Sequence, residues 1–285
     1  MIKKTNYLVL IEATNSNPNG DPDNENAPRM DPDTEYGIIT NQCLNRKVRN
    51  QVMLHMDDKS KYDIFIQTDK TLNEKQKDAF AETGFDITKS GNKPEQTDIQ
   101  KAKQFMLAKY FDIRTFCAVL STGDYPAGRV TGAVQTSFAR TVTPVTIQEV
   151  PLTRQALTND NRKNVNAENE MGKKYIVPYG LYAFKVSVSA VQAEKNGFTQ
   201  DDLNVYENAL MNMFENDESS ARGDVNVRAV YRFTHEDKLG NVPTWKIYDL
   251  VHIDPNKEYP RSFNDFDIYV DEDKMPKGIT VEQIL

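Results

Sequence analysis

The chain has 285 residues, of which 38% are hydrophobic and 27% are charged, and its formal net charge at pH 7 is −7. This composition is typical of a globular protein with a sizeable core and excludes an intrinsically disordered chain. The acidic balance also excludes a protein that coats nucleic acid through bulk positive charge, so any nucleic-acid site has to be built from local basic clusters or backbone donors.

The cysteines and the N-terminus indicate the compartment. Cys43 and Cys117 stand in no metal-binding or redox spacing, so we expect two free thiols in a reducing compartment. The basic start, residues 1–4, is followed by an apolar run that ends at Glu12. Because this run is too short for a secretory signal or a membrane span, we predict a cytoplasmic protein without a membrane partner.

A strand and a turn-rich acidic loop begin the chain. The continuous apolar run of residues 7–11 predicts a strand that is buried on both faces. The loop over residues 15–36 holds six acids: Asp21, Asp23, Glu25, Asp31, Asp33 and Glu35. Their spacing does not fit a calcium-binding EF-hand, because the twelfth position from Asp21 is Pro32 instead of Glu. We interpret the segment as a proline-stiffened loop, and a metal-dependent ribonuclease that uses residues 21–33 is the alternative function.

The next segment, residues 40–56, has a helical period with two unlike faces. Apolar residues recur at every fourth position on one face: Leu44, Val48, Val52 and Met56. The opposite face carries Gln42, Arg46, Arg49 and Met53, and Lys47 flanks it. Between Tyr36 and Met56 there are three cations and no acid, although the chain as a whole is acidic. The pattern favours a local anion site, and an ordinary solvated surface helix is the alternative.

Residues 57–104 change in composition and are rich in Lys, Asp, Glu and Gln. Helical spacing occurs near residues 72–80 and 99–110, and residues 62–66 predict a short strand. We therefore predict a mainly helical insertion on the core, polar enough to face solvent or a neighbouring subunit.

A second buried strand is predicted at residues 116–120, and a glycine-rich loop follows at residues 121–132. The loop nearly matches a nucleotide-binding P-loop, but Arg129 and Val130 replace its Lys and its Ser or Thr, so nucleotide hydrolysis is not expected. Glycines such as Gly123 still permit close backbone approach, and exposed N–H groups beside Arg129 can hold a phosphate. An ordinary flexible turn is the alternative.

The rest of the chain alternates strands with one further helix, which Thr199 is expected to cap. The polar segment of residues 151–177 predicts a long protruding hairpin. The segment of residues 219–223 places Arg222 beside a serine hydroxyl, either as a phosphate contact or as a polar helix exit. Strands are predicted at residues 134–142, 179–191, 226–235, 245–253 and 266–270.

This order of elements predicts an α+β fold, a ferredoxin-like or RNA-recognition-motif sheet with two helices on one face and the other face open. His55, His235 and His252 are far apart and in no ligand spacing, and the sequence contains no zinc-protease, dithiol or serine-hydrolase motif. We therefore expect each histidine to be structural and no cofactor to be bound, and a Mg²⁺ ion held by the acidic loop stays open as the minor alternative.

Several stretches together resemble one family. They are Asn17-Pro18-Asn19-Gly20-Asp21-Pro22-Asp23, Pro28-Arg29-x-Asp31, Thr40-x2-Cys43-Leu44-x-Arg46-Lys47-Val48-Arg49-Asn50, Phe111-Asp112-Ile113-Arg114-Thr115-Phe116, Ser137-Phe138-Ala139-Arg140, Val177-Pro178-Tyr179-Gly180-Leu181-Tyr182 and Ala221-Arg222-Gly223. In this order they resemble the backbone subunit of the CRISPR Cascade surveillance complex, a member of the RAMP superfamily. Among the variants of this family they resemble subtype I-C, within the Csd/Csh family, with I-B as its near relative.

The resemblance implies an RNA-recognition-motif-like palm of residues 1–56, 105–150 and 178–285, a helical finger insertion of residues 57–104, and a β-hairpin thumb of residues 151–177. It further implies a non-catalytic subunit whose copies form a filament along the CRISPR RNA (crRNA) and support pairing with the target DNA strand. The implied partners are the guide-processing, large and small Cascade subunits and a helicase-nuclease that the complex recruits.

The resemblance also implies which residues contact the guide RNA: Asn17, Asn19, Gln42, Arg46, Lys47, Arg49, Ser121, Gly123, Gly128, Arg129, Arg140, Arg154, Lys173 and Arg222. The sequence departs from the family pattern at Asn45, Thr131 and Glu218, where basic residues are usual. Three lost cations lower the expected affinity of each subunit for phosphate.

Overall fold

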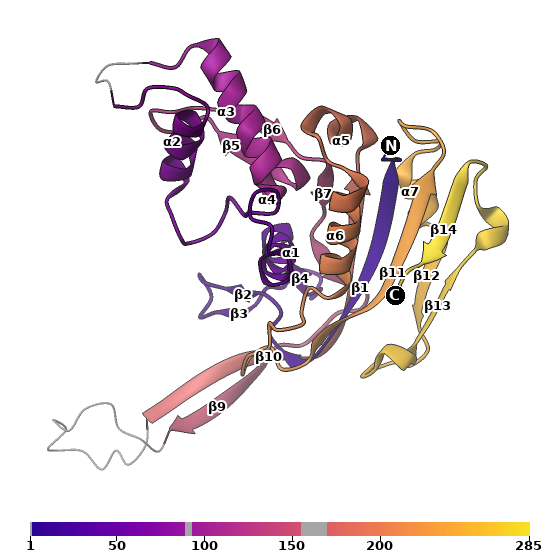
Figure 1. Cartoon of the computed structure of the whole chain (residues 1–285). Coiled ribbons are helices and arrows are strands. Elements are labelled where there is room, and N and C mark those ends of the chain that lie inside the picture. Colours follow the sequence, from indigo (N-terminus) through magenta and orange to yellow (C-terminus); the bar gives the residue numbers. More distant parts are fainter. Residues whose placement is uncertain (1, 89–92, 155–169) are drawn as a thin grey trace, which may run out of the picture.

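The computed structural model describes residues 2–88, 93–154 and 170–285. Its centre is an eight-stranded antiparallel sheet in the order β14-β11-β1-β10-β8-β4, with β7 and β9 also paired to β10 (Figure 1). Val9 in the middle strand stands opposite Phe184 on one side and Val230 on the other. The strands are β1 (Thr5–Ser16), β4 (Ile38–Ile39), β7 (Val134–Thr136), β8 (Ala139–Thr141), β9 (Gln148–Arg154), β10 (Glu170–Val188), β11 (Val225–His235) and β14 (Ile279–Gln283).

Helices α1 (Asn41–His55) and α6 (Gln200–Met211) cover one face of this sheet. The apolar stripe that the sequence predicts for α1 is confirmed, since Leu44, Val48 and Val52 are buried against the sheet. Thr199 caps α6 as predicted, in a capping box with Asp202. The chain therefore runs β1, α1, β8, β10, α6, β11, which is a β-α-β-β-α-β order.

The opposite face of the sheet is covered as well, so the prediction of an open face is wrong. Leu8, Leu10 and Phe233 point to this side and pack beneath α7 (Thr244–Tyr248), β12 (Val251–Pro255) and β13 (Phe266–Val270). The predicted burial of residues 7–11 on both faces is confirmed, and it requires such a cover. Residues 245–253 were expected as one strand, but their first half forms α7.

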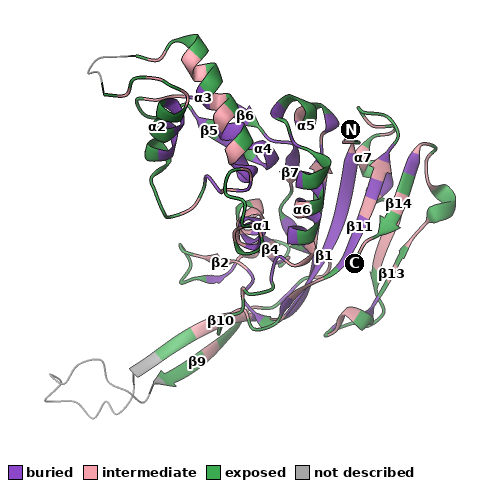
Figure 2. Ribbon diagram, viewed as in Figure 1, coloured by how far each residue is buried: buried purple, intermediate pink, exposed green. Residues whose placement is uncertain are grey.

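A second compact body stands beside the sheet (Figures 1 and 2). Its core contains Phe65, Phe80, Met106, Leu120 and Val130. Residues 62–66 form no strand, and the strand expected at residues 116–120 belongs to this body, where it alternates between exposed and buried positions. The predicted boundary after residue 104 falls inside α3. The elements are α2 (Leu72–Glu82), α3 (Gln96–Lys109), α4 (Phe111–Thr115), β5 (Cys117–Leu120) and β6 (Gly128–Thr131).

Two buried ion pairs fasten this second body to the helices of the sheet. Arg49 of α1 donates to Asp112 of α4 at 2.9 Å, and Arg114 donates to Asp202 of α6 at 2.7 Å. Asp112 also accepts hydrogen bonds from the backbone amides of Phe65 and Ile66. Each carboxylate is thus satisfied by several donors, as a buried charge requires.

The β9–β10 hairpin extends out of the body, and Figure 2 colours much of its described part as exposed. The sequence predicts a hairpin over residues 151–177; residues 155–169 of this range lie outside the described residues, and the rest belongs to β9 and β10. Shorter elements complete the fold: β2 (Gly20–Asp21), β3 (Ala27–Pro28), α5 (Ala190–Asn196) and the 3-10 turns η1 (Phe263–Asp265) and η2 (Glu272–Lys274). Within the described residues, every helix is too short or too polar to cross a bilayer.

Candidate nucleic-acid interface

The turn after β1 is tied to the start of α1 by two predicted site residues. Asn19 accepts hydrogen bonds at its Oδ1 from the amide of Thr40 at 2.9 Å and from the Thr40 hydroxyl at 3.0 Å. Asn17 donates through Nδ2 to the carbonyl of Asn26 at 2.7 Å. Both asparagines therefore hold the loop in shape, because Thr40 is itself the N-cap of α1. The Oδ1 atom of Asn17 is buried and has no partner among the described residues.

Lys47 and Arg222 meet at the same place and share one acid. Lys47 lies 2.6 Å from an Asp217 carboxylate oxygen, and Arg222 lies 3.1 Å from it. The turn that carries Arg222 also accepts a 2.6 Å hydrogen bond, at the Ala221 carbonyl, from the amide of Asn17. Asp217 thus holds two cations at one place, and Glu215, Glu218 and Asp224 line the same small cavity beside Arg222.

The base of the β9–β10 hairpin lies against both of these loops. Lys173 forms a 2.5 Å ion pair with Glu25, and the Tyr175 hydroxyl donates to the same carboxylate at 2.9 Å. Lys174 donates to the carbonyl of Ser220 at 3.2 Å. The side chain of Arg154, at the end of β9, lies outside the described residues.

Arg140 of β8 lies on the exposed side of the sheet edge. Its guanidinium is 3.0 Å from Asp31 and 3.2 Å from the Thr34 hydroxyl, and it lies over the ring of Tyr36. The hydroxyl of Thr34 and the amide of Asp33 lower the pKa of Asp31, so this carboxylate stays ionised beside the cation.

The remaining predicted residues face the second body. Arg46 of α1 donates to the carbonyl of Ile66 at 2.8 Å, and Gln42 is exposed one turn before it. A Cβ atom added at Gly123 would lie 2.8 Å from the Asn73 side chain, at the start of α2. Arg46 and the glycine-rich loop therefore touch the two ends of the segment of residues 66–73.

The glycine-rich loop is shorter than predicted, because residues 128–131 form β6. Gly123 and Gly128 have φ angles of 78° and 85°, which favour glycine. Ser121 and Arg129 are exposed, and Arg129 has no acidic partner in the part of the chain that the structure describes. The carbonyl of Arg129 accepts a hydrogen bond from Lys103 at 2.9 Å. This tip offers one unpaired guanidinium beside turn amides.

The side chain of Arg49, which is expected at the RNA backbone, is buried and paired within the protein. Its side chain is buried between Asp112 and the Phe116 ring, whose centroid lies 4.9 Å from the guanidinium carbon. Lys47 is also buried by its contact with Asp217. Sequence periodicity placed Arg49 opposite the sheet, but the second body covers that side of α1. The sequence carried a signal for this partner, since Asp112 lies in one of the motifs that resemble the family.

The acidic loop acts as an ion-pair partner in this structure. Asp21 lies 3.3 Å from Arg29, and Glu25 and Asp31 face Lys173 and Arg140. Among the described residues, no three His, Cys, Asp or Glu side chains are grouped closely enough to hold a metal ion. Acids of this loop therefore have cations of the same chain as partners. No observation favours the ribonuclease alternative.

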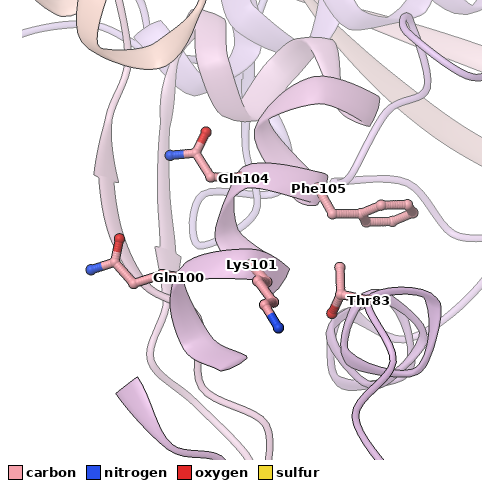
Figure 3. A pocket seen from close by; sticks show the side chains of 5 residues that line it. All are labelled: Thr83, Gln100, Lys101, Gln104 and Phe105. Atoms are coloured by element: carbon pink, nitrogen blue, oxygen red, sulfur yellow. The ribbon is translucent and has the colours of Figure 1, made fainter. Parts of the chain in front are cut away.

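The sequence does not single out Arg29, Lys174, Tyr175 and Asp217 as site residues, yet they contact the predicted residues or the loops beside them. A different open pocket lies on the second body, where Thr83 at the end of α2 faces Phe105 and Lys101 of α3 (Figure 3). None of the predicted site residues lines it. Most of the candidate residues fall into two groups. The junction group contains Asn17, Asn19, Lys47, Lys173 and Arg222, of which Asn17 and Lys47 are buried, and the finger group contains Arg46, Ser121, Gly123, Gly128 and Arg129.

Comparisons with known proteins identify a family that matches this chain. The family model described as "CRISPR-associated protein Cas7" matches residues 3–271. A curated protein of the same description from Haloferax volcanii is 39% identical over 66 residues, which are 23% of this chain and 18% of that protein. The aligned stretch therefore spans less than a fifth of that relative.

Two solved structures are similar in fold. A chain of one described as "CRISPR RNA-guided surveillance complex, pre-nicking" has a TM-score of 0.52 at 14% identity, with 86% of each chain covered. A chain of a second, described as "CRISPR RNA-guided surveillance complex", has a TM-score of 0.44 at 15% identity, with 85% of this chain and 80% of that chain covered. The first likeness supports a mixed α/β fold with antiparallel sheets. Because the family model spans the sequence from Lys3 to Asp271, this chain belongs to the CRISPR-associated protein Cas7 family.

Proposed function

We propose that this chain is a non-catalytic backbone subunit of a Cascade complex of subtype I-C, and that its copies line up along a crRNA in the cytoplasm. The central sheet with α1 and α6 serves as an RNA-recognition-motif-like palm, the second body as the finger, and the β9–β10 hairpin as the thumb. The complex would also hold the guide-processing, large and small subunits, pair the guide with a target DNA strand, and recruit a helicase-nuclease.

One observation carries the proposal. The turn of Asn17 and the turn of Arg222 both lie beside the start of α1 and against the base of the hairpin. Each of them brings a cation or an amide to the same junction. The finger group lies at the other side of α1 and adds Arg46 and Arg129. A strand of RNA that follows α1 would therefore find donors along its whole path.

The proposal also accounts for the acidic net charge. A subunit that binds in a filament needs few phosphate contacts, because contacts between neighbouring subunits add to the affinity. The many acids elsewhere on the surface then limit binding to unrelated RNA.

The experiment is the salt dependence of single-stranded RNA binding. Each phosphate contact contributes about 0.7 to the slope of log affinity against log salt concentration. The double variant Arg46→Ala/Arg129→Ala should therefore lower the slope by about 1.4. The matched control is Lys195→Ala/Lys277→Ala, two exposed cations on α5 and near β14 that remove the same charge. Equal slopes for both variants would contradict the assigned path.

A further inference from the structure

The acidic loop contacts cations on two separate strands of the sheet. Its first lobe, residues 20–28, is pinned by the short β2–β3 ladder and places Glu25 on Lys173 of β10. Its second lobe, residues 29–37, is closed by the Met30–Gly37 bridge and places Asp31 on Arg140 of β8. Each lobe thus presents a carboxylate to a residue of the predicted RNA path.

The chemistry of these contacts is that of a bound phosphate. Lys173 and the Tyr175 hydroxyl both donate to Glu25, and the guanidinium of Arg140 donates to Asp31. A carboxylate oxygen accepts the same hydrogen bonds as a phosphate oxygen and carries the same sign of charge. As long as the loop stays in place, both cations are neutralised and present little positive potential to an RNA strand.

The contacts are exposed, and that makes them exchangeable. The side chains of Lys173 and Glu25 are 43% and 62% exposed, and that of Arg140 is 54% exposed. Solvent-exposed ion pairs contribute little to stability, and salt screens them. Glu25 also adopts a φ angle of 49°, which is unfavourable for a residue with a side chain, within a turn closed by the backbone bond from the Asn26 amide to the Asp21 carbonyl. A polyanion can therefore replace both carboxylates without unfolding the protein.

We propose that residues 20–37 form an autoinhibitory loop, in which Glu25 and Asp31 occupy Lys173 and Arg140 in place of RNA phosphates until a guide strand displaces them. This inference rests on the proposed function, since it needs the hairpin base and β8 to lie on the RNA path. The loop raises selectivity, because a short or weakly bound RNA cannot displace both lobes together.

The test compares variants of the full chain in binding to a fluorescein-labelled oligouridine strand, followed by fluorescence anisotropy. Glu25→Gln/Asp31→Asn keeps the shape of both side chains and releases both cations. We expect about tenfold tighter binding at low salt. The slope of log affinity against log salt should steepen by about 0.7 for each released cation.

The matched control removes two charges from the same loop that pair with no cation in the described part of the chain. Asp23→Asn/Asp33→Asn changes the net charge by the same amount, and both side chains are exposed. It should change affinity less than twofold and leave the slope as it is in the wild type. If the control tightens binding as much as Glu25→Gln/Asp31→Asn does, the effect is bulk electrostatics and the inference is overturned.

A double-mutant cycle separates a loop effect from a folding effect. Lys173→Gln removes the cation that Glu25 covers, so adding Glu25→Gln to it should bring no further gain. A full gain in the absence of Lys173 would overturn the inference. RNA binding by the wild type with no gain in Glu25→Gln/Asp31→Asn would overturn the inference alone. Absence of RNA binding in every protein would overturn the proposed function and the inference with it.

Discussion

At the scale of single residues, Arg49 changes role between sequence and structure. Its position on α1 suggested a phosphate contact, yet its guanidinium is buried against Asp112. Removing one partner of a buried ion pair leaves the other charge uncompensated. Asp112 would keep only the amides of Phe65 and Ile66 as donors.

Arg49→Ala should therefore lower the free energy of unfolding by about 3–5 kcal/mol, as measured by urea denaturation. Arg46→Ala, one turn earlier and bonded only to a carbonyl, should change it by less than about 0.5 kcal/mol. Equal stabilities of the two variants would show that the Arg49–Asp112 pair does not hold the second body to α1.

His235 gives the fold a pH dependence. It is fully buried, its Nδ1 accepts a hydrogen bond from the Asn241 amide, and its Nε2 lies 3.0 Å from Asn6 Oδ1. Burial, helped by the charge of Lys4, lowers the pKa of His235 below 6.5. The unfolded chain therefore takes up this proton at a higher pH than the folded chain, so the stability is complete above 6.5 and is lost as the pH falls below it.

Urea denaturation at several pH values on both sides of 6.5 measures this effect. His235→Gln should be less stable at neutral pH but should lose less stability on acidification than the wild type. His252→Gln, which replaces a partly exposed ring stacked on Tyr269, should follow the wild-type pH curve. If His235→Gln kept the wild-type dependence of stability on pH, that dependence would belong to another titratable group.

At the scale of elements, the close contact between the chain just after α4 and the chain just before β7 depends on one glycine. A Cβ atom on Gly132 would lie 1.3 Å from the Phe116 carbonyl oxygen, so the backbone itself has to move. Gly132→Ala should destabilise the protein by about 3 kcal/mol or more. Gly172→Ala in the hairpin meets nothing within 4 Å and should be close to neutral. Thermal unfolding distinguishes the two, and a Gly132→Ala protein that melts like the wild type would contradict the close approach.

The hairpin is the element that can be removed without loss of the core. Val150 and Lys174 stand opposite each other, so an Asn-Gly turn can join them in place of residues 151–173. We expect the melting temperature to remain within a few degrees, because the described side chains beyond this pair are exposed. RNA binding should weaken and lose its cooperativity between subunits. Undiminished cooperative binding would remove the hairpin from the interface.

The sequence predicted helices well where local spacing and capping residues define them. The four-residue repeat of α1 and the threonine cap of α6 were read correctly, because local periodicity and capping do not depend on distant residues. Residues 62–66 and 245–250 were misread as strands, because a short apolar run does not distinguish a strand from a buried turn or helix.

The site was predicted less completely, for a physical reason. The sequence identified Lys47 and Arg222 as cations, but their shared partner Asp217 is defined only by the fold. In the same way, the acids around Glu25 and Asp31 were read as a loop of their own, whereas each of these two pairs with a cation more than a hundred residues away. Ion pairs between distant segments leave no periodic trace in a sequence.

At the scale of the whole molecule, both faces of the sheet are covered. The face opposite α1 and α6 packs beneath α7, β12 and β13, so the described part of the sheet leaves no broad open face on which bases could stack. The proposed RNA path therefore follows α1, between the hairpin base and the glycine-rich loop. On that path, Arg46 and Arg129 are two cations without an acidic partner among the described residues, and they would supply positive charge on an otherwise acidic protein.

The most direct test is to purify the protein from cells that carry a CRISPR array and to measure its absorbance ratio at 260 and 280 nm together with its mass. The account predicts a ratio typical of a ribonucleoprotein and a particle several times larger than the 32.5 kDa chain. Both should fall to those of a free subunit in Arg46→Ala/Arg129→Ala and persist in Lys195→Ala/Lys277→Ala. A wild-type protein that elutes as a monomer free of RNA would contradict the account.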